Sequence, residues 1–183
     1  MLKKLEKDNR HGLLINITGN GKGKTTSAFG TALRALGWGW KVTAIQFIKS
    51  SSTNTGEKQL ADSINLPFEI ITMGAGFTWN RKITEAEHIK CAQDAWQLTS
   101  DYIINGKVDL LIMDELNIAL DKKWLDMTEV IKVLQQRPKW MHLIITGRNA
   151  VNEIIEVSDL VSEIKELKHP FNAGIIAQQG IEF

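Results

Sequence analysis

The sequence predicts an α/β fold in which a mostly parallel β-sheet is flanked by helices. Apolar, β-rich runs alternate with helical patterns along the chain, which is the order expected of parallel strands joined by crossover helices. The runs are almost continuously apolar, as in strands that are buried on both faces. Because ligands of such sheets bind at the carboxyl ends of the strands, the residues that follow each predicted strand are the first candidates for a functional site.

The predicted elements follow one another without a linker, an internal repeat or a low-complexity segment. Strands are predicted over residues 13–17, 42–48, 68–73, 108–113, 142–146 and 160–167, and shorter helices over 27–36, 57–64, 128–136 and 151–157. A longer helix is predicted from Thr84, which forms a capping box with Glu87, to a stop at Asn105 and Gly106.

Length and composition indicate one domain over residues 1–183, with residues 1–11 as a flexible arm. The formal net charge of +1 provides no strong field for nucleic acid or a membrane surface. No apolar run approaches the ~20 residues of a membrane span, and no signal peptide is visible, so we expect a cytoplasmic protein. The single cysteine, Cys91, excludes an intrachain disulfide, and we expect it to be a buried, inert thiol.

The segment after the first predicted strand has the pattern of a phosphate-binding loop. Residues 18–26 read TGNGKGKTT and lie between a predicted strand and a predicted helix, which is the setting of a P-loop. The glycines let backbone N–H groups point at an anion, and the helix N-terminus adds positive charge. Lys24 supplies an ammonium for phosphate oxygens, and the Thr25 hydroxyl can ligate Mg²⁺. The fold class is therefore that of the P-loop NTPases, with a RecA-like architecture.

Thr18 stands where the usual pattern, G-x-x-x-x-G-K-[ST], has its first glycine. This departure puts the usual placement of the phosphates in doubt, but not phosphate binding itself. The alternative interpretation is an ordinary glycine-rich turn. The strand, the helix and the Gly23-Lys24-Thr25 sequence together argue against it.

Two further candidates follow strands at the same edge of the predicted sheet. Asp114 and Glu115 directly follow an apolar strand, which is the position of a Walker B carboxylate, and carboxylates beside phosphate oxygens suit Mg²⁺. Glu115 is either a metal ligand or the base that activates a water; the alternative for both residues is a pair of surface acids that open a helix. Arg148 pairs with a phosphate or the carboxylates, or forms a structural salt bridge.

A longer series of motifs is more specific than the loop alone. It comprises TGNGKGKTT at 18–26, AFGTA at 28–32, RA at 34–35, QFIK at 46–49, GFTW at 76–79, DEL at 114–116, RP at 137–138, IITGR at 144–148, KHPFNAG at 168–174, AQ at 177–178 and GI at 180–181. The series resembles the P-loop ATP:corrinoid adenosyltransferases from about Gly12 to the last residue, with all motifs in order. The family's loop has the same form at Thr18.

The resemblance implies an enzyme that transfers the 5′-deoxyadenosyl group of ATP to the Co(I) of a reduced corrinoid and releases triphosphate, in adenosylcobalamin synthesis or corrinoid salvage. In this family the triphosphate lies reversed in the loop, which exposes the nucleoside 5′ carbon to attack. Lys24 is implied in catalysis, and Mg²⁺ is implied with Thr25, Asp114 and Glu115 as ligands. The implied nucleotide-binding residues are Gly19, Asn20, Gly21, Lys22, Gly23, Lys24, Thr25, Thr26, Arg34 and Arg148.

Phe77 and Trp79 are implied to be an apolar wedge that displaces the lower axial ligand of Co(II) and so eases its reduction. From the residues alone, two core anchors that close a loop are the preferred interpretation. The resemblance further implies a homodimer and a flavoprotein reductant. The alternative for Arg34 is a solvent-facing helix arginine, His88 is expected on a helix surface, and His169 as a hydrogen-bonded structural histidine.

Two other functions are compatible with the P-loop. A hydrolytic ATPase would use Glu115 to polarise a water and Arg148 to sense the γ-phosphate, and it would release ADP and phosphate. A regulatory module would bind ATP without turnover. The ordered series of motifs favours the transferase over both.

Overall fold

The fold is a six-stranded sheet in which every pair of neighbouring strands is parallel. The computed structural model describes residues 6–50, 52, 55–76 and 82–182. The strands are β1 (Leu14–Thr18), β2 (Val42–Gln46), β3 (Phe68–Thr72), β4 (Leu110–Asp114), β5 (His142–Thr146) and β6 (Leu160–Glu163), in the spatial order β3-β2-β4-β5-β1-β6. The predicted fold class is therefore confirmed.

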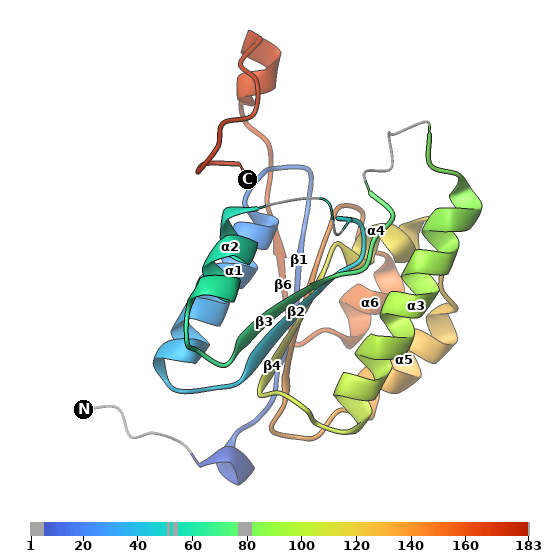
Figure 1. Cartoon of the computed structure of the whole chain (residues 1–183). Coiled ribbons are helices and arrows are strands. Elements are labelled where there is room, and N and C mark those ends of the chain that lie inside the picture. Colours follow the sequence, from blue (N-terminus) through green and yellow to red (C-terminus); the bar gives the residue numbers. More distant parts are fainter. Residues whose placement is uncertain (1–5, 51, 53–54, 77–81, 183) are drawn as a thin grey trace.

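Helices cover both faces of this sheet (Figure 1). Two of them, α1 (Lys24–Gly37) and α2 (Gly56–Ser63), lie on one face, and α3 (Glu85–Ile104), α4 (Leu116–Asp121), α5 (Met127–Gln135) and α6 (Asn152–Val157) lie on the other. Short 3-10 turns, η1 (Lys7–Asn9) and η2 (Pro170–Ala173), lie near the two termini. No helix of the described residues is long and apolar enough to cross a membrane.

The two faces of the sheet contribute to two separate hydrophobic clusters. In β4, Leu110 and Ile112 pack into the cluster that contains α1, whereas Leu111 and Met113 pack into the cluster that contains α3 and α5. This alternation follows from the two-residue period of a strand. Because both faces are buried, both sets are apolar, which explains the continuous apolar runs in the sequence.

Several boundaries differ from the prediction because tertiary contacts decide them. β2 ends at Gln46, two residues early, yet Phe47 and Ile48 remain buried. An apolar run thus predicts burial, but not where the ladder of hydrogen bonds stops. β6 likewise ends at Glu163 and not at residue 167, and the six-residue helix α4 was not predicted. The capping box of Thr84 and Glu87 is confirmed.

Two predictions for side chains on α3 are wrong. His88, expected on the helix surface, is buried and stacks on Trp124 with ring centroids 5.1 Å apart and planes 6° apart. The cause is the chain after α4, which covers the first turns of α3 and which the periodicity of α3 does not reveal. Cys91, expected to be buried, is only partly so. His169 is hydrogen-bonded as predicted, since its Nδ1 accepts from Phe171 N at 3.1 Å.

The described part of the predicted amino-terminal arm is attached to the domain. Arg10 donates to Asp109 Oδ1 at 2.8 Å, and its guanidinium lies over the Trp40 ring, 4.2 Å from the centroid. These contacts lie at the end of the sheet opposite the loop between β1 and α1 (Figure 1). The chain around Arg10 therefore differs from a flexible arm, and it lies away from the predicted site.

Candidate active site

The glycine-rich loop joins β1 to α1, as its sequence predicts. Gly23 precedes the first residue of α1 and has a φ of +107°, a left-handed conformation that favours glycine. Gly21 lies against the end of β6: its N–H donates to Ile164 O at 2.9 Å, and a Cβ there would lie 2.8 Å from Ile164 Cγ2. The loop is thus positioned by the chain that follows β6 as well as by its own strand and helix.

Thr18, which replaces the usual first glycine, has a positioning role in this structure. Its side chain is buried, and its Oγ1 accepts a hydrogen bond from Ala150 N at 3.1 Å. Its carbonyl accepts from Ile164 N at 2.8 Å. Thr18 therefore connects the start of the phosphate loop to the segment that carries Arg148.

The remaining predicted residues of the loop lie together at the carboxyl edge of the sheet. Gly19 lies beside Ile164, Asn20 is exposed, Lys22 forms an ion pair with Glu182 near the carboxyl terminus, and Thr26 is exposed in the first turn of α1. The ion pair brings the tail back to the phosphate loop.

Lys24 and Thr25 are directed by contacts within this edge. Lys24 Nζ donates to Gly21 O at 2.7 Å. Burial, and then the charge of Arg148, lower the pKa of the Lys24 ammonium. Thr25 Oγ1 donates to Asp114 Oδ1 at 2.8 Å. The P-loop helix and the end of β4 are therefore joined by a hydrogen bond, which confirms that these predicted residues meet.

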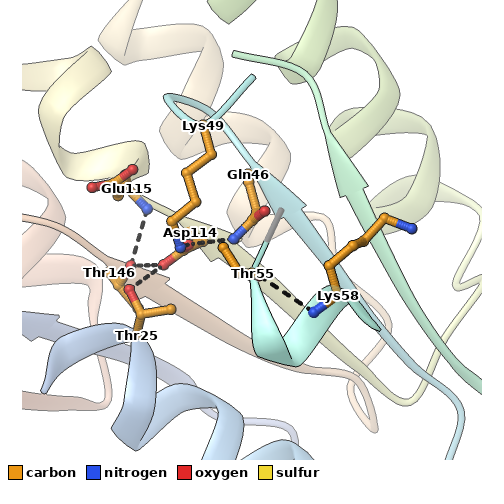
Figure 2. A network of polar contacts seen from close by, with 8 residues as sticks. All are labelled: Thr25, Gln46, Lys49, Thr55, Lys58, Asp114, Glu115 and Thr146. Carbon is orange, nitrogen blue, oxygen red and sulfur yellow. Dashed lines mark hydrogen bonds and ion pairs between the residues drawn. The ribbon is translucent and has the colours of Figure 1, made fainter. Parts of the chain in front are cut away.

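Asp114 is fully buried and has donors on both carboxylate oxygens (Figure 2). Oδ1 accepts from the hydroxyls of Thr25 and Thr146, each at 2.8 Å. Oδ2 accepts from Gln46 Nε2 at 3.0 Å and from Lys49 Nζ at 3.3 Å. A buried carboxylate requires such compensation, and these four contacts occupy its usual acceptor positions.

Glu115 differs from its neighbour in both backbone and side chain. Its φ is +67°, which is uncommon for a residue other than glycine and is often found at functional sites. Its N–H donates to Thr146 Oγ1 at 2.9 Å, while its Oε2 is buried and has no hydrogen-bond partner within the described part of the chain. Figure 2 shows its carboxyl group turned away from the contacts around Asp114.

Burial and the charged side chains around Glu115 set its pKa, and these side chains set the net charge of the site. Burial and then the charge of Asp114 raise the pKa of Glu115 to about 7, against the opposing effect of Lys49, Lys24 and Arg148. Burial is the largest single effect on the pKa of Lys49, and it lowers this pKa. The carboxylates of Asp114 and Glu115 together outweigh burial, so the pKa of Lys49 is raised. Three cationic side chains thus surround two carboxyl groups, an arrangement that suits an additional anion.

Arg148 lies in the exposed loop after β5 and acts electrostatically on both Lys24 and Glu115. Within the described ranges, no ion pair shorter than 4.0 Å includes it. Among the residues that the structure describes, the salt bridge that was one alternative for Arg148 is therefore not found.

One predicted residue is not brought into the site, and two others cannot be placed because they lie outside the described residues. Arg34 is exposed on α1, ten residues after Lys24, which is about 15 Å along a helix axis. Phe77 and Trp79 lie outside the described residues. The segment before them is anchored beside the site, since Gly74 N donates to Lys49 O and Gly76 N to Ile48 O, both at 2.9 Å.

Sequence reasoning assigned no role to several residues that the structure places here. Gln46 ends β2, Lys49 lies three residues beyond it, and Thr146 ends β5, so the rule that selected Asp114 could have selected them. Asn16 and Asn117 form a buried, reciprocal amide pair at 3.0 and 3.1 Å. The signal for that pair is a polar residue in the middle of an apolar strand.

The fold and the site define a P-loop nucleotide-binding α/β protein. A search against family models matches residues 10–183 to the family described as ATP:corrinoid adenosyltransferase BtuR/CobO/CobP. The chain belongs to this family. It is 41% identical over 172 residues to the corrinoid adenosyltransferase of Escherichia coli K12, covering 94% of this chain and 86% of that protein. The identity to the corrinoid adenosyltransferase CobA of Salmonella typhimurium is also 41%, with the same coverage. For the Sinorhizobium enzyme it is 39% over 179 residues, 97% of this chain and 83% of that protein.

Proposed function

We propose that this protein transfers the 5′-deoxyadenosyl group of ATP to the cobalt of a reduced corrinoid. The observation that carries the proposal is the convergence of Lys24, Thr25, Asp114 and Glu115 at one sheet edge, in a chain of this family. In the reaction, the electron pair of Co(I) forms the Co–C bond to C5′. The C5′–O bond breaks, and its electron pair leaves with triphosphate.

The reaction requires the protein to position the two substrates and to compensate the charge on the leaving triphosphate. Since Co(I) brings its own electron pair, no protein base is needed to create a nucleophile. The loop must hold triphosphate so that C5′ is exposed, and cations must balance the charge that develops on the leaving oxygen. Lys24 suits this role because, among the described residues, its ammonium donates only to a loop carbonyl, Gly21 O, which a phosphate oxygen can replace.

The residues at this edge also fit Mg²⁺, which would neutralise part of the triphosphate charge when bound. We propose Thr25 Oγ1 and the carboxyl of Glu115, whose Oε2 is buried without a hydrogen-bond partner among the described residues, as its protein ligands. Asp114, whose oxygens already have four donors, would act by holding the Thr25 hydroxyl in place. The described residues contain no group of three or more His, Cys, Asp or Glu side chains suited to a metal, and Mg²⁺ shared with phosphate and water needs none.

The segment that contains Phe77 and Trp79 is our candidate for contact with the corrinoid. We propose that these aromatic side chains displace the lower axial ligand of Co(II), so that a flavoprotein can reduce it to Co(I). The anchoring of Gly74 to Lys49 at 2.9 Å supports this, because it starts the aromatic segment beside the phosphate site. We further propose a cytoplasmic homodimer, in which Arg34 of one subunit could reach nucleotide or partner-subunit groups.

The test is an anaerobic assay that follows adenosylcobalamin by absorbance and identifies the phosphate product. We expect one triphosphate for each adenosylcorrinoid, formed only with a reduced corrinoid. ADP released without corrinoid would contradict the proposal and support the hydrolytic ATPase. Nucleotide binding with no turnover under reducing conditions would support the regulatory module.

A further inference from the structure

Lys49 is held at the site by its backbone, although it belongs to neither the phosphate loop nor the acidic pair. It lies three residues beyond the end of β2. Phe47 N donates to Asp114 O at 3.0 Å, and Lys49 O accepts from Gly74 N at 2.9 Å. Phe47 and Ile48 are buried. The origin of the Lys49 side chain is therefore fixed beside Asp114 at the carboxyl edge of the sheet.

The ammonium of Lys49 is the most weakly held donor on Asp114. It lies 3.3 Å from Oδ2, whereas the other three donors lie at 2.8 to 3.0 Å, and a good charge-assisted N–H···O bond measures about 2.7–2.9 Å. An ammonium has three N–H groups, and among the described residues Asp114 is the one acceptor of the Lys49 ammonium. The side chain is 17% exposed, so the remaining N–H groups are within reach of a ligand.

The charges of the site show where such a ligand would lie. Lys24 and Lys49 both act on the Glu115 carboxyl. Lys24 is the first residue of the P-loop helix, and Lys49 extends toward Asp114 from the chain after β2 (Figure 2). Asp114 bridges the two sides, because Thr25 binds one of its oxygens and Lys49 the other. Thr25 and the Lys49 ammonium are thus separated by a single carboxyl group, so a polyphosphate bound at Thr25 would lie near Lys49.

We propose that Lys49 contacts the polyphosphate of the bound nucleotide and balances the charge that develops on triphosphate as the C5′–O bond breaks. This inference rests on the proposed function, because it requires a nucleotide at the P-loop. It makes Lys49 a second catalytic lysine, which exchanges part of its contact with Asp114 for phosphate oxygens. Lys24 and Lys49 would then hold the leaving group from opposite sides.

The test measures binding as well as turnover. Isothermal titration with inorganic tripolyphosphate and Mg²⁺, and separately with ATP and AMP, compares the wild type with Lys49→Met, Lys49→Gln and Lys49→Arg. The matched control is Lys90→Met, on the exposed face of α3. We expect Lys49→Met and Lys49→Gln to weaken tripolyphosphate binding about 10- to 100-fold, the range of a lost hydrogen bond to a charged group. Lys49→Arg should restore most of it, and Lys90→Met should change nothing.

The outcomes separate this proposal from a structural role and from failure of the proposed function. A contact to polyphosphate requires a larger loss for ATP than for AMP, and a lower rate in single turnover with chemically prepared Co(I). If Lys49→Gln binds tripolyphosphate as the wild type does and only its thermal midpoint falls, Lys49 serves Asp114 alone and the proposal is overturned. Lys49→Gln keeps a donor for Asp114, so the test stands even where Lys49→Met does not fold. If the wild type itself binds neither tripolyphosphate nor ATP, the nucleotide site is wrong, which is a different result.

Discussion

Replacing Thr146 by valine would test the hydrogen-bonded frame of the site, because the two side chains have nearly the same shape. Thr146 is fully buried, and its hydroxyl donates to Asp114 Oδ1 at 2.8 Å while it accepts from Glu115 N at 2.9 Å. A hydrogen bond to a charged group contributes about 1.5–3 kcal/mol, and an amide that loses its acceptor costs about 1–3 kcal/mol. Since the Glu115 amide is only partly buried, we expect Thr146→Val to lower the free energy of unfolding by about 3 kcal/mol, near the low end of the summed range.

The assay is equilibrium unfolding in urea, with the slope of the transition compared between variants to verify that only stability changes. The matched control is Thr31→Val on α1, whose hydroxyl bonds to Ser27 O at 3.2 Å in an exposed turn. We expect the control to change stability by less than about 0.5 kcal/mol. A loss below about 1 kcal/mol for Thr146→Val, smaller than any charged hydrogen bond should give, would refute the role of Thr146 as the link between Asp114 and Glu115.

Three further predictions address the corrinoid side, the metal and the fold. Phe77→Ala and Trp79→Ala should abolish turnover from Co(II) but retain it from chemically prepared Co(I); equal loss from both substrates would contradict the wedge. Glu115, with a pKa of about 7, is increasingly protonated as the pH falls below 7, so Mg²⁺-dependent ATP affinity should be lower at pH 6 than at pH 8, and Glu115→Gln should remove this dependence in calorimetry. His142 Nδ1 accepts from Leu13 N at 3.2 Å, and burial, then Arg10 and Arg137, lower the pKa of His142 below 6.5. The neutral His142 side chain therefore stabilises the fold above pH 6.5, and this stabilisation is lost as the pH falls. The thermal midpoint of the wild type should decrease from pH 8 to pH 5.5, and that of His142→Asn should decrease less.

The fold could be predicted because its signals are local. The central strands show themselves as nearly continuous apolar runs, whereas β6 is exposed at all four positions. The long helix α3 is predicted by a capping box that the structure confirms. Predictions failed where a distant segment decides the outcome. The burial of His88 depends on Trp124, and the end of β2 depends on the turn of the chain over Asp114, whose carbonyl accepts from Phe47 N. The sequence periodicity of α3 does not reveal the contact with Trp124, and that of β2 does not reveal the contact with Asp114.

The site could be predicted only in part, for a similar reason. The P-loop is a continuous motif, and Asp114 and Glu115 were found because they end a strand at the ligand-binding edge. The contacts of Lys49 and Gln46 with Asp114 span 65 and 68 positions of sequence, and the Asn16–Asn117 pair spans 101. A single sequence shows the polar residue but not the one that it meets, so these side chains had no assigned role.

The hydrogen bonds of Asp114 indicate why binding and stability should be linked at this site. Its donors come from three separate segments: the start of α1, the end of β2 with the turn that follows it, and the end of β5. Replacing the carboxylate by the amide of asparagine would place an NH2 donor opposite one pair of these donors, and it would remove the negative charge that all four share. Asp114→Asn should therefore lose stability and Mg²⁺-ATP affinity in the same variant, whereas Glu115→Gln, at a carboxyl group that accepts no hydrogen bond from the described residues, should lose affinity alone. Unfolding and calorimetry on both variants test this, and loss of affinity without loss of stability in Asp114→Asn would show that Asp114 acts as a metal ligand instead of a frame.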